Sequence, residues 1–73
     1  MPIVTINMLE GRDREIKKDL IKNVTTAITG TLRIPEESVR IIINEMPFEN
    51  YGVAGLPIRE YREKKENNID SRS

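Results

Sequence analysis

The chain opens with the apolar run Pro2-Ile3-Val4-Thr5-Ile6-Asn7-Met8-Leu9. Val4, Ile6 and Met8 share one parity of this run, which is the pattern of a strand with one strongly apolar face. Pro2 suits the start of such a strand, because the first residue is one of the few sheet positions that tolerate proline. The run therefore predicts a strand over residues 3–9.

A helix is predicted next. Gly11 permits a tight turn, and Asp13 is a suitable N-cap for a helix that begins at Arg14. Apolar residues then recur at helical spacing, namely Ile16, Leu20, Ile21, Val24, Ala27 and Ile28. Basic residues take the remaining face, namely Arg14, Lys17, Lys18 and Lys22. Gly30 weakens the last turn and Pro35 prevents its continuation, so we expect an amphipathic helix with one buried stripe and one solvated face.

A second strand is predicted from Ser38 to Met46. Because a helix separates the two strands, we expect them to be parallel and joined by a right-handed crossover. Residues 50–55 are punctuated by glycine and indicate a turn or short hairpin. The predicted fold class is therefore α/β (α+β), a β-α-β unit with parallel strands plus a C-terminal hairpin. From Arg59 onward the chain is charged and polar, and we expect a tail that is helical at first and then frayed.

Composition limits what this single small domain of 73 residues can do. It has no Cys, which excludes disulfides, and no His, the commonest metal ligand and general base. A chain this short buries only about 60% of its unfolded surface, so we expect it to oligomerise through its exposed sheet edges. Twelve basic residues balance twelve acidic ones, which argues against a nucleic-acid partner. No apolar run is long enough to span a membrane, and we expect a cytoplasmic protein.

Pro2 carries the first chemical signal, because it directly follows Met1. Removal of Met1 would convert the proline nitrogen from an amide into a free secondary amine. An α-amino group has a pKa of about 7.7–8.0, and burial or neighbouring cations lower the pKa of an amine further. A proton-transfer base works best with a pKa near the working pH. The alternative is that Pro2 only blunts the end of a strand.

Arg40 carries the second signal, because it interrupts an otherwise apolar strand. A charged side chain in such a strand needs an anion to meet. Two alternatives remain open from the residues alone. In the first, Arg40 is structural: it lies on a solvated strand face or pairs with Glu37 or Glu45. In the second, it binds an anionic substrate.

Three segments resemble the 4-oxalocrotonate tautomerase family. They are Pro2-Ile3-Val4-Thr5-Ile6-Asn7-Met8-Leu9-Glu10-Gly11-Arg12, Ser38-Val39-Arg40-Ile41-Ile42-Ile43-Asn44-Glu45-Met46 and Tyr51-Gly52-Val53-Ala54-Gly55. The resemblance implies a tautomerase domain over residues 2–58, followed by a charged C-terminal extension over residues 59–73. It also implies the tautomerase fold, assembled as dimers and commonly as a hexamer, a trimer of dimers.

The activity that the resemblance implies is a cofactor-independent isomerase reaction. The family interconverts keto and enol forms of 2-hydroxy or 2-oxo unsaturated carboxylates, such as 2-hydroxymuconate in aromatic hydrocarbon catabolism. The implied partners are therefore a small carboxylate or dicarboxylate and further copies of the chain, with neither nucleic acid nor membrane. The physiological substrate, the choice between dimer and hexamer, and homo- or hetero-assembly stay open.

The resemblance also assigns roles to residues. It implies that Pro2 is the general base and that Arg40 binds the substrate's carboxylate and 2-oxygen. Arg12 then binds the distal carboxylate of a dicarboxylate substrate. Tyr51 matches a position that the family usually fills with phenylalanine, where the aromatic ring forms an apolar wall beside the amine and helps to keep its pKa low. Two further residues, Leu9 and Ser38, match positions that line the substrate pocket. Each of these residues also has a purely structural explanation: Arg12 as a surface loop residue, Tyr51 as hairpin packing, Leu9 as core and Ser38 as a turn cap.

Two other functions compete with the tautomerase. The same scaffold supports dehalogenation or decarboxylation of small acids, with a protonated Pro2 as an acid. Dehalogenation needs a carboxylate that activates water, and residues 51–55 contain none. The other alternative is a non-catalytic oligomeric binding domain, in which the extension after residue 58 serves a partner.

Overall fold

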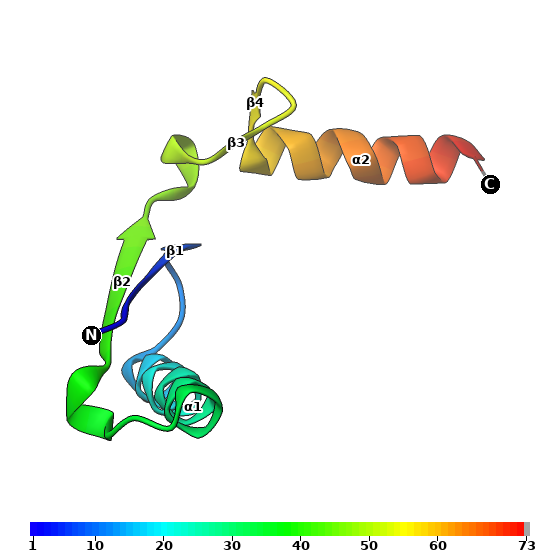
Figure 1. Cartoon of the computed structure of the whole chain (residues 1–73). Coiled ribbons are helices and arrows are strands. Elements are labelled where there is room, and N and C mark those ends of the chain that lie inside the picture. The colour runs from blue at the N-terminus through cyan, green and yellow to red at the C-terminus, as the bar shows by residue number, and fades with distance from the viewer. Residues whose placement is uncertain (73) are drawn as a thin grey trace.

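A computed structural model describes the backbone of residues 1–72 and the side chains of residues 1–66. The elements run in the order β1 (Ile3–Leu9), α1 (Arg14–Leu32), η1 (Glu36–Ser38), β2 (Arg40–Met46), η2 (Phe48–Asn50), β3 (Gly52–Val53), β4 (Leu56–Pro57) and α2 (Ile58–Arg72). Figure 1 shows two parts: the β1–β2 sheet with α1 beside it, and the hairpin with α2, which extends away from the sheet. The predicted β-α-β unit with a C-terminal hairpin is confirmed.

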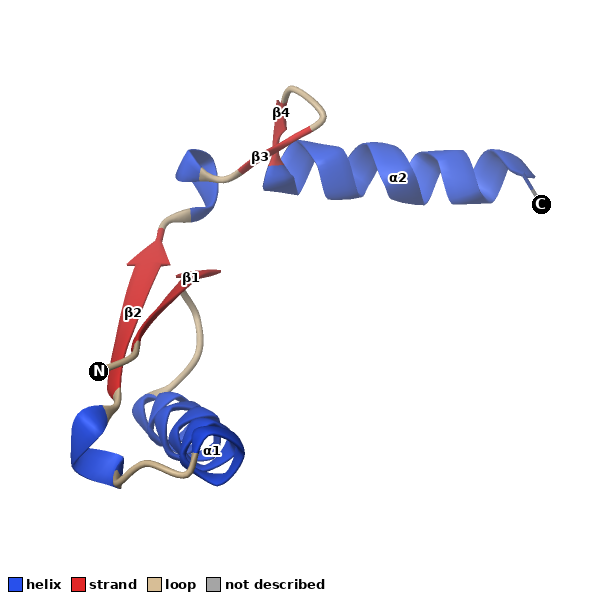
Figure 2. Cartoon of the chain, in the orientation of Figure 1, coloured by secondary structure: helices blue, strands red, loops and turns tan. Residues whose placement is uncertain are grey.

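The two long strands are parallel, as expected. Their register pairs Ile3 with Arg40 at one end and Leu9 with Met46 at the other. Alternation then places Val4 and Ile6 on the half-buried face toward α1. The opposite face is bare: Ile3 is 64% exposed and Ile42 is 46% exposed. Figure 2 shows that α1 covers only one side of the sheet.

The helix α1 begins and ends where local chemistry dictates. The Ile16 N–H donates to the Asp13 carboxylate at 2.9 Å, so Asp13 is the predicted N-cap. At the other end Arg33 adopts a left-handed conformation with φ of 57°, and its N–H donates to the Thr29 carbonyl at 2.8 Å. The helix therefore stops at Leu32, before Pro35.

Two sequence expectations about α1 were wrong. The apolar stripe is not buried in a single chain: Ile16 is 51% exposed and Ile21 is 41% exposed, because one two-stranded sheet is too narrow to cover it. Lys17 does not lie on the solvated face. Its ammonium group reaches across to the Glu45 carboxylate of β2 at 2.8 Å, so the basic face of the helix also contacts the sheet.

The second strand is shorter than predicted. It begins at Arg40 rather than Ser38, because residues 36–38 form a short 3₁₀ turn. In that turn the Ser38 N–H donates to the Pro35 carbonyl, and the Val39 N–H donates to the Glu36 carbonyl, both at 3.0 Å. These backbone groups are therefore used locally and are not free to extend the ladder with β1.

The hairpin β3–β4 turns at Ala54 and Gly55, whose φ angles are 54° and 83°. Two successive positive φ angles are typical of the tight turns that match strand twist. The helix α2 follows at once and continues to Arg72, further than the frayed tail that the sequence suggested. Glu, Lys and Arg are good helix formers, and Glu60 lies four residues before Lys64, which favours continuation of the helix beyond its first turn.

The isolated chain has almost no core. Among the residues with described side chains, only Val39 and Ile58 are buried, at 8% and 6% exposure. The radius of gyration is 17.2 Å, whereas a compact domain of this length has one of about 11 Å. Neither helix combines the length and apolar character that a bilayer crossing requires, within the part of the chain that the structure describes. The open shape and the bare sheet face agree with a chain that gains its core by association.

Candidate active site

Pro2 and Arg40 lie at the same end of the sheet. The parallel register sets Ile3 opposite Arg40, and the Arg40 N–H donates to the Pro2 carbonyl at 3.1 Å. Met1 precedes Pro2 and is 80% exposed, so the bond that must be cut to free the Pro2 nitrogen is accessible. The fold thus brings together the two residues that carried the chemical signals in the sequence.

The Arg40 side chain does not form either predicted ion pair. Its guanidinium donates to the backbone carbonyls of Glu37 and, at 3.4 Å, Val39. The Glu45 carboxylate forms its ion pair with Lys17 instead. Carbonyl oxygens hold the guanidinium without neutralising it, so Arg40 keeps its positive charge for an anion that approaches this end of the sheet. Ser38 lies two residues earlier, in the 3₁₀ turn, and is half-buried.

The other predicted site residues lie at the opposite end of β1. Leu9, Arg12 and Tyr51 line a pocket of about 570 Å³. The remaining lining residues are Asn7, Met8, Glu10, Gly11, Met46, Phe48 and Arg62. Gly11 has a φ of 122°, which allows the chain to turn sharply out of the strand and present Arg12 to the pocket.

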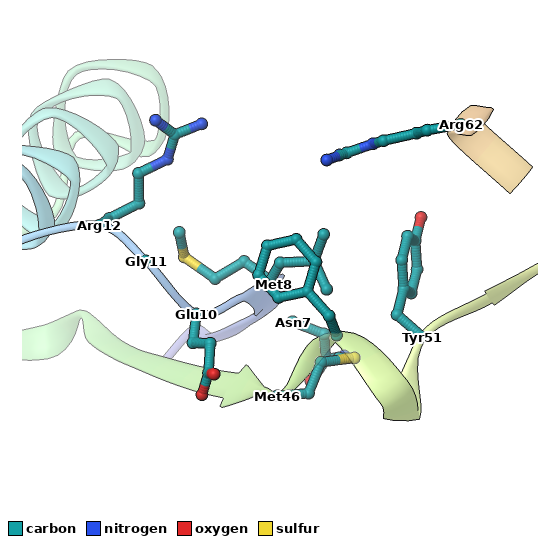
Figure 3. Close-up of a pocket in the computed structure, with 10 residues that line it drawn as sticks. Asn7, Met8, Glu10, Gly11, Arg12, Met46, Tyr51 and Arg62 are labelled. Carbon is teal, nitrogen blue, oxygen red and sulfur yellow. The ribbon is translucent and has the colours of Figure 1, made fainter. Parts of the chain in front are cut away.

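Figure 3 shows how charge is arranged in this pocket. The Arg12 and Arg62 side chains extend from opposite sides toward the same space, above Met8. The ring of Tyr51 stands on the Arg62 side, and the Glu10 carboxylate points away from both guanidinium groups. The pocket therefore combines an apolar floor with two cations, which suits a carboxylate attached to a hydrocarbon chain.

One chain does not bring the two ends together. Six residue steps separate Ile3 from Leu9 in the register, and a strand rises about 3.3 Å per residue, so the Pro2 end of β1 and the end that lines the pocket lie roughly 20 Å apart. This exceeds the length of a small dicarboxylate. A site that uses Pro2 and Arg12 on one substrate molecule must therefore draw them from different chains.

Sequence reasoning missed Arg62 and Phe48 as pocket residues. A signal for Arg62 was present, because Ile58, Tyr61 and Arg62 have the spacing that puts side chains on one helix face. Ile58 is buried and Tyr61 is half-buried, so Arg62 shares the face of α2 that packs toward the rest of the chain. Within the described residues no group of three or more acidic, His or Cys side chains gathers that could hold a metal ion.

Comparison with known proteins decides the family. Residues 2–61 match the model of the Tautomerase family, described as "Tautomerase enzyme". The chain belongs to the tautomerase family. It is 49% identical over 55 residues to a 2-hydroxymuconate tautomerase of Stutzerimonas stutzeri, a match that covers 75% of this chain and 87% of the relative.

Solved structures of tautomerases share the fold. A 4-oxalocrotonate tautomerase isozyme from Methylibium petroleiphilum superposes with a TM-score of 0.80 at 36% identity, covering 86% of this chain and 98% of the other. A heterohexameric 4-oxalocrotonate tautomerase from Chloroflexus aurantiacus J-10-fl gives 0.78 at 35% identity, covering 82% and 97%. The chain is thus an enzyme of the tautomerase family, and the resemblance that its sequence carries to the 4-oxalocrotonate tautomerases is confirmed.

Proposed function

We propose that this tautomerase interconverts the enol and keto forms of small unsaturated 2-hydroxy and 2-oxo acids such as 2-hydroxymuconate, with the amine of Pro2 as general base. The observation that carries the proposal is the placement of Pro2 beside Arg40 by the parallel register. The similarity to a 2-hydroxymuconate tautomerase supports the substrate class.

The chemistry begins with removal of Met1, which turns the Pro2 nitrogen into a secondary amine. The neutral amine accepts the proton of the substrate's 2-hydroxyl group and returns a proton to a carbon of the conjugated system. Arg40 binds the adjacent carboxylate and the 2-oxygen, where negative charge develops as the proton leaves. Its planar guanidinium suits two parallel hydrogen bonds to these oxygens.

The pocket residues at the other end of β1 complete the site from a neighbouring chain. Arg12 holds the distal carboxylate and draws electron density along the conjugated system. The ring of Tyr51 and the side chain of Leu9 form apolar walls, while Ser38 lines the end near Arg40. Apolar surroundings and two cations both lower the pKa of an amine, which keeps Pro2 neutral near pH 7.

The assembly that we propose is a homohexamer of three dimers. Its support is the separation of roughly 20 Å between the two ends of β1, and the bare sheet face that carries Ile3 and Ile42. A solved tautomerase of similar fold is described as a heterohexamer. Pairing of sheet edges between two chains, followed by packing of the bare faces, would bury this surface and join the two halves of the site.

The test follows the ultraviolet absorbance of 2-hydroxymuconate. Wild-type protein is first shown by intact mass to lack Met1. Replacing Pro2 by Ala leaves a primary amine that the proline ring no longer orients, and should lower kcat/KM by roughly 100-fold, since a positioned general base contributes about 10²–10⁴. A chain extended at its N-terminus, in which the Pro2 nitrogen stays an amide, should lose activity in the same way. Equal rates for all three proteins would defeat the proposal.

A further inference from the structure

The C-terminal helix brings a second arginine to the pocket. Arg62 of α2 faces Arg12 across the pocket, although the two residues lie 50 positions apart in the chain (Figure 3). The family match ends at residue 61, so Arg62 lies just beyond the part of the chain that the family describes.

The first turn of α2 is anchored. The Ile58 N–H donates to the Tyr51 carbonyl at 2.8 Å, and the Ile58 side chain is only 6% exposed. The Arg59 guanidinium lies 4.5 Å from the centre of the Phe48 ring, a cation–π contact with η2. Arg62 follows one helical turn after Ile58 and therefore projects from a fixed base rather than from a loose tail.

The two guanidinium groups face one another without a local counter-ion. Over residues 1–66 the structure contains no ion pair to Arg12 or Arg62; the pair that it does contain joins Lys17 and Glu45. The Glu10 carboxylate, although it lines the pocket, points away from both arginines (Figure 3). Two like charges that approach one space repel, and a bound carboxylate relieves that repulsion and hydrogen-bonds to both.

We propose that Arg62 is a specificity-determining residue that, together with Arg12, selects substrates with a second carboxylate. This inference rests on the proposed function, and it assigns to α2 a role in substrate choice. The Tyr51 hydroxyl lies on the Arg62 side of the pocket and supplies a further donor to the same carboxylate. A monocarboxylate leaves both guanidinium groups without an anion and so gains nothing from Arg62.

The test compares binding of two unreactive conjugated acids by titration calorimetry. They are hexa-2,4-dienedioate (muconate), with two carboxylates, and hexa-2,4-dienoate (sorbate), with one. Arg62→Gln should weaken muconate binding by about tenfold, because hydrogen bonds to charged groups are among the strongest in proteins, and should change sorbate binding less than twofold. The matched control is Lys64→Gln, which removes the same charge from the same helix at a residue that does not line the pocket. It should change neither affinity.

Steady-state kinetics supply the second readout. On 2-hydroxymuconate, Arg62→Gln should raise KM by about tenfold and leave kcat within twofold, and Arg62→Lys should restore part of the loss. Equal weakening of both acids, no change for muconate, or no muconate binding by wild-type protein would overturn the proposal. Because calorimetry needs no turnover, an inactive wild type that still prefers muconate through Arg62 would refute the tautomerase function and not the carboxylate site.

Discussion

Mixing two inactive variants should restore activity, because Pro2 and the pocket that Arg12 lines lie at opposite ends of β1, whose ends are roughly 20 Å apart. Pro2→Ala replaces the ring amine with a primary amine that no ring holds in position, and Arg12→Gln removes a cation from the pocket, so each variant alone should fall to a few per cent of wild-type activity or less. If every site takes Pro2 from one chain and Arg12 from another, an equal mixture contains some sites in which both residues are intact.

The expected recovery follows from random assembly of identical subunits. Half of the chains supply an intact Pro2 and the other half supply an intact Arg12, so about a quarter of the sites are complete. The two variants are unfolded together in denaturant, refolded, and assayed with 2-hydroxymuconate at a concentration at which wild-type protein is assembled. Activity should rise to about a quarter of the wild-type value.

A matched control separates this outcome from simple averaging. The double variant Pro2→Ala, Arg12→Gln is refolded in an equal mixture with wild-type protein. Sites shared between chains predict about a quarter of wild-type activity in this mixture, whereas sites within one chain predict about a half. A mixture of the single variants that never exceeds the mean of its parents, together with half activity in the control, would refute the reasoning from the strand length.

Two further predictions follow from the same structure. If neutral Pro2 is the base, protonation inactivates it, so kcat/KM for 2-hydroxymuconate should fall about tenfold per pH unit below the pKa of the amine and level off above it. A pH–rate profile that falls on the alkaline side instead would indicate the acid mechanism of a dehalogenase or decarboxylase. Ile42→Glu places a charge on the bare sheet face, where Ile42 is 46% exposed in the single chain. Light scattering should show smaller species with proportionate loss of activity, because an unpaired charge at an interface costs several kcal/mol. An active hexamer of unchanged mass would contradict the proposed burial of this face.

The elements were predictable because their signals lie close together in the chain, and the parallel pairing followed from the helix that separates the two strands. The Asp13 cap lies three residues from its partner, and the parity of Val4 and Ile6 gave the strand face directly. The shorter β2 could not be foreseen from parity alone. Ser38 and Val39 continue the alternating pattern, and only the backbone hydrogen bonds of the 3₁₀ turn withdraw them from the ladder.

The candidate site was predictable only in part. The residues themselves indicated Pro2 and Arg40, while the roles of Arg12 and Tyr51 came from the family resemblance. The spacing of Ile58, Tyr61 and Arg62 places Arg62 on the packed face of α2, but it does not show that this face meets the pocket, which depends on how the hairpin anchors α2. The separation into two half-sites was likewise visible only once the register fixed which end of the sheet each residue occupies.

Assembly and catalysis are coupled in this chain by its geometry. A single copy leaves Ile3, Ile16 and Ile42 about half exposed or more, so association must supply the apolar burial that a domain of this size lacks. In the proposed assembly, the same association closes the distance between Pro2 and the arginine pocket. If the site is shared in this way, a substitution on the bare face lowers activity without changing a residue of the site, and a folded but dissociated chain has no complete site. Dilution below the assembly threshold should consequently lower activity per chain, whereas a site within one chain would be indifferent to concentration.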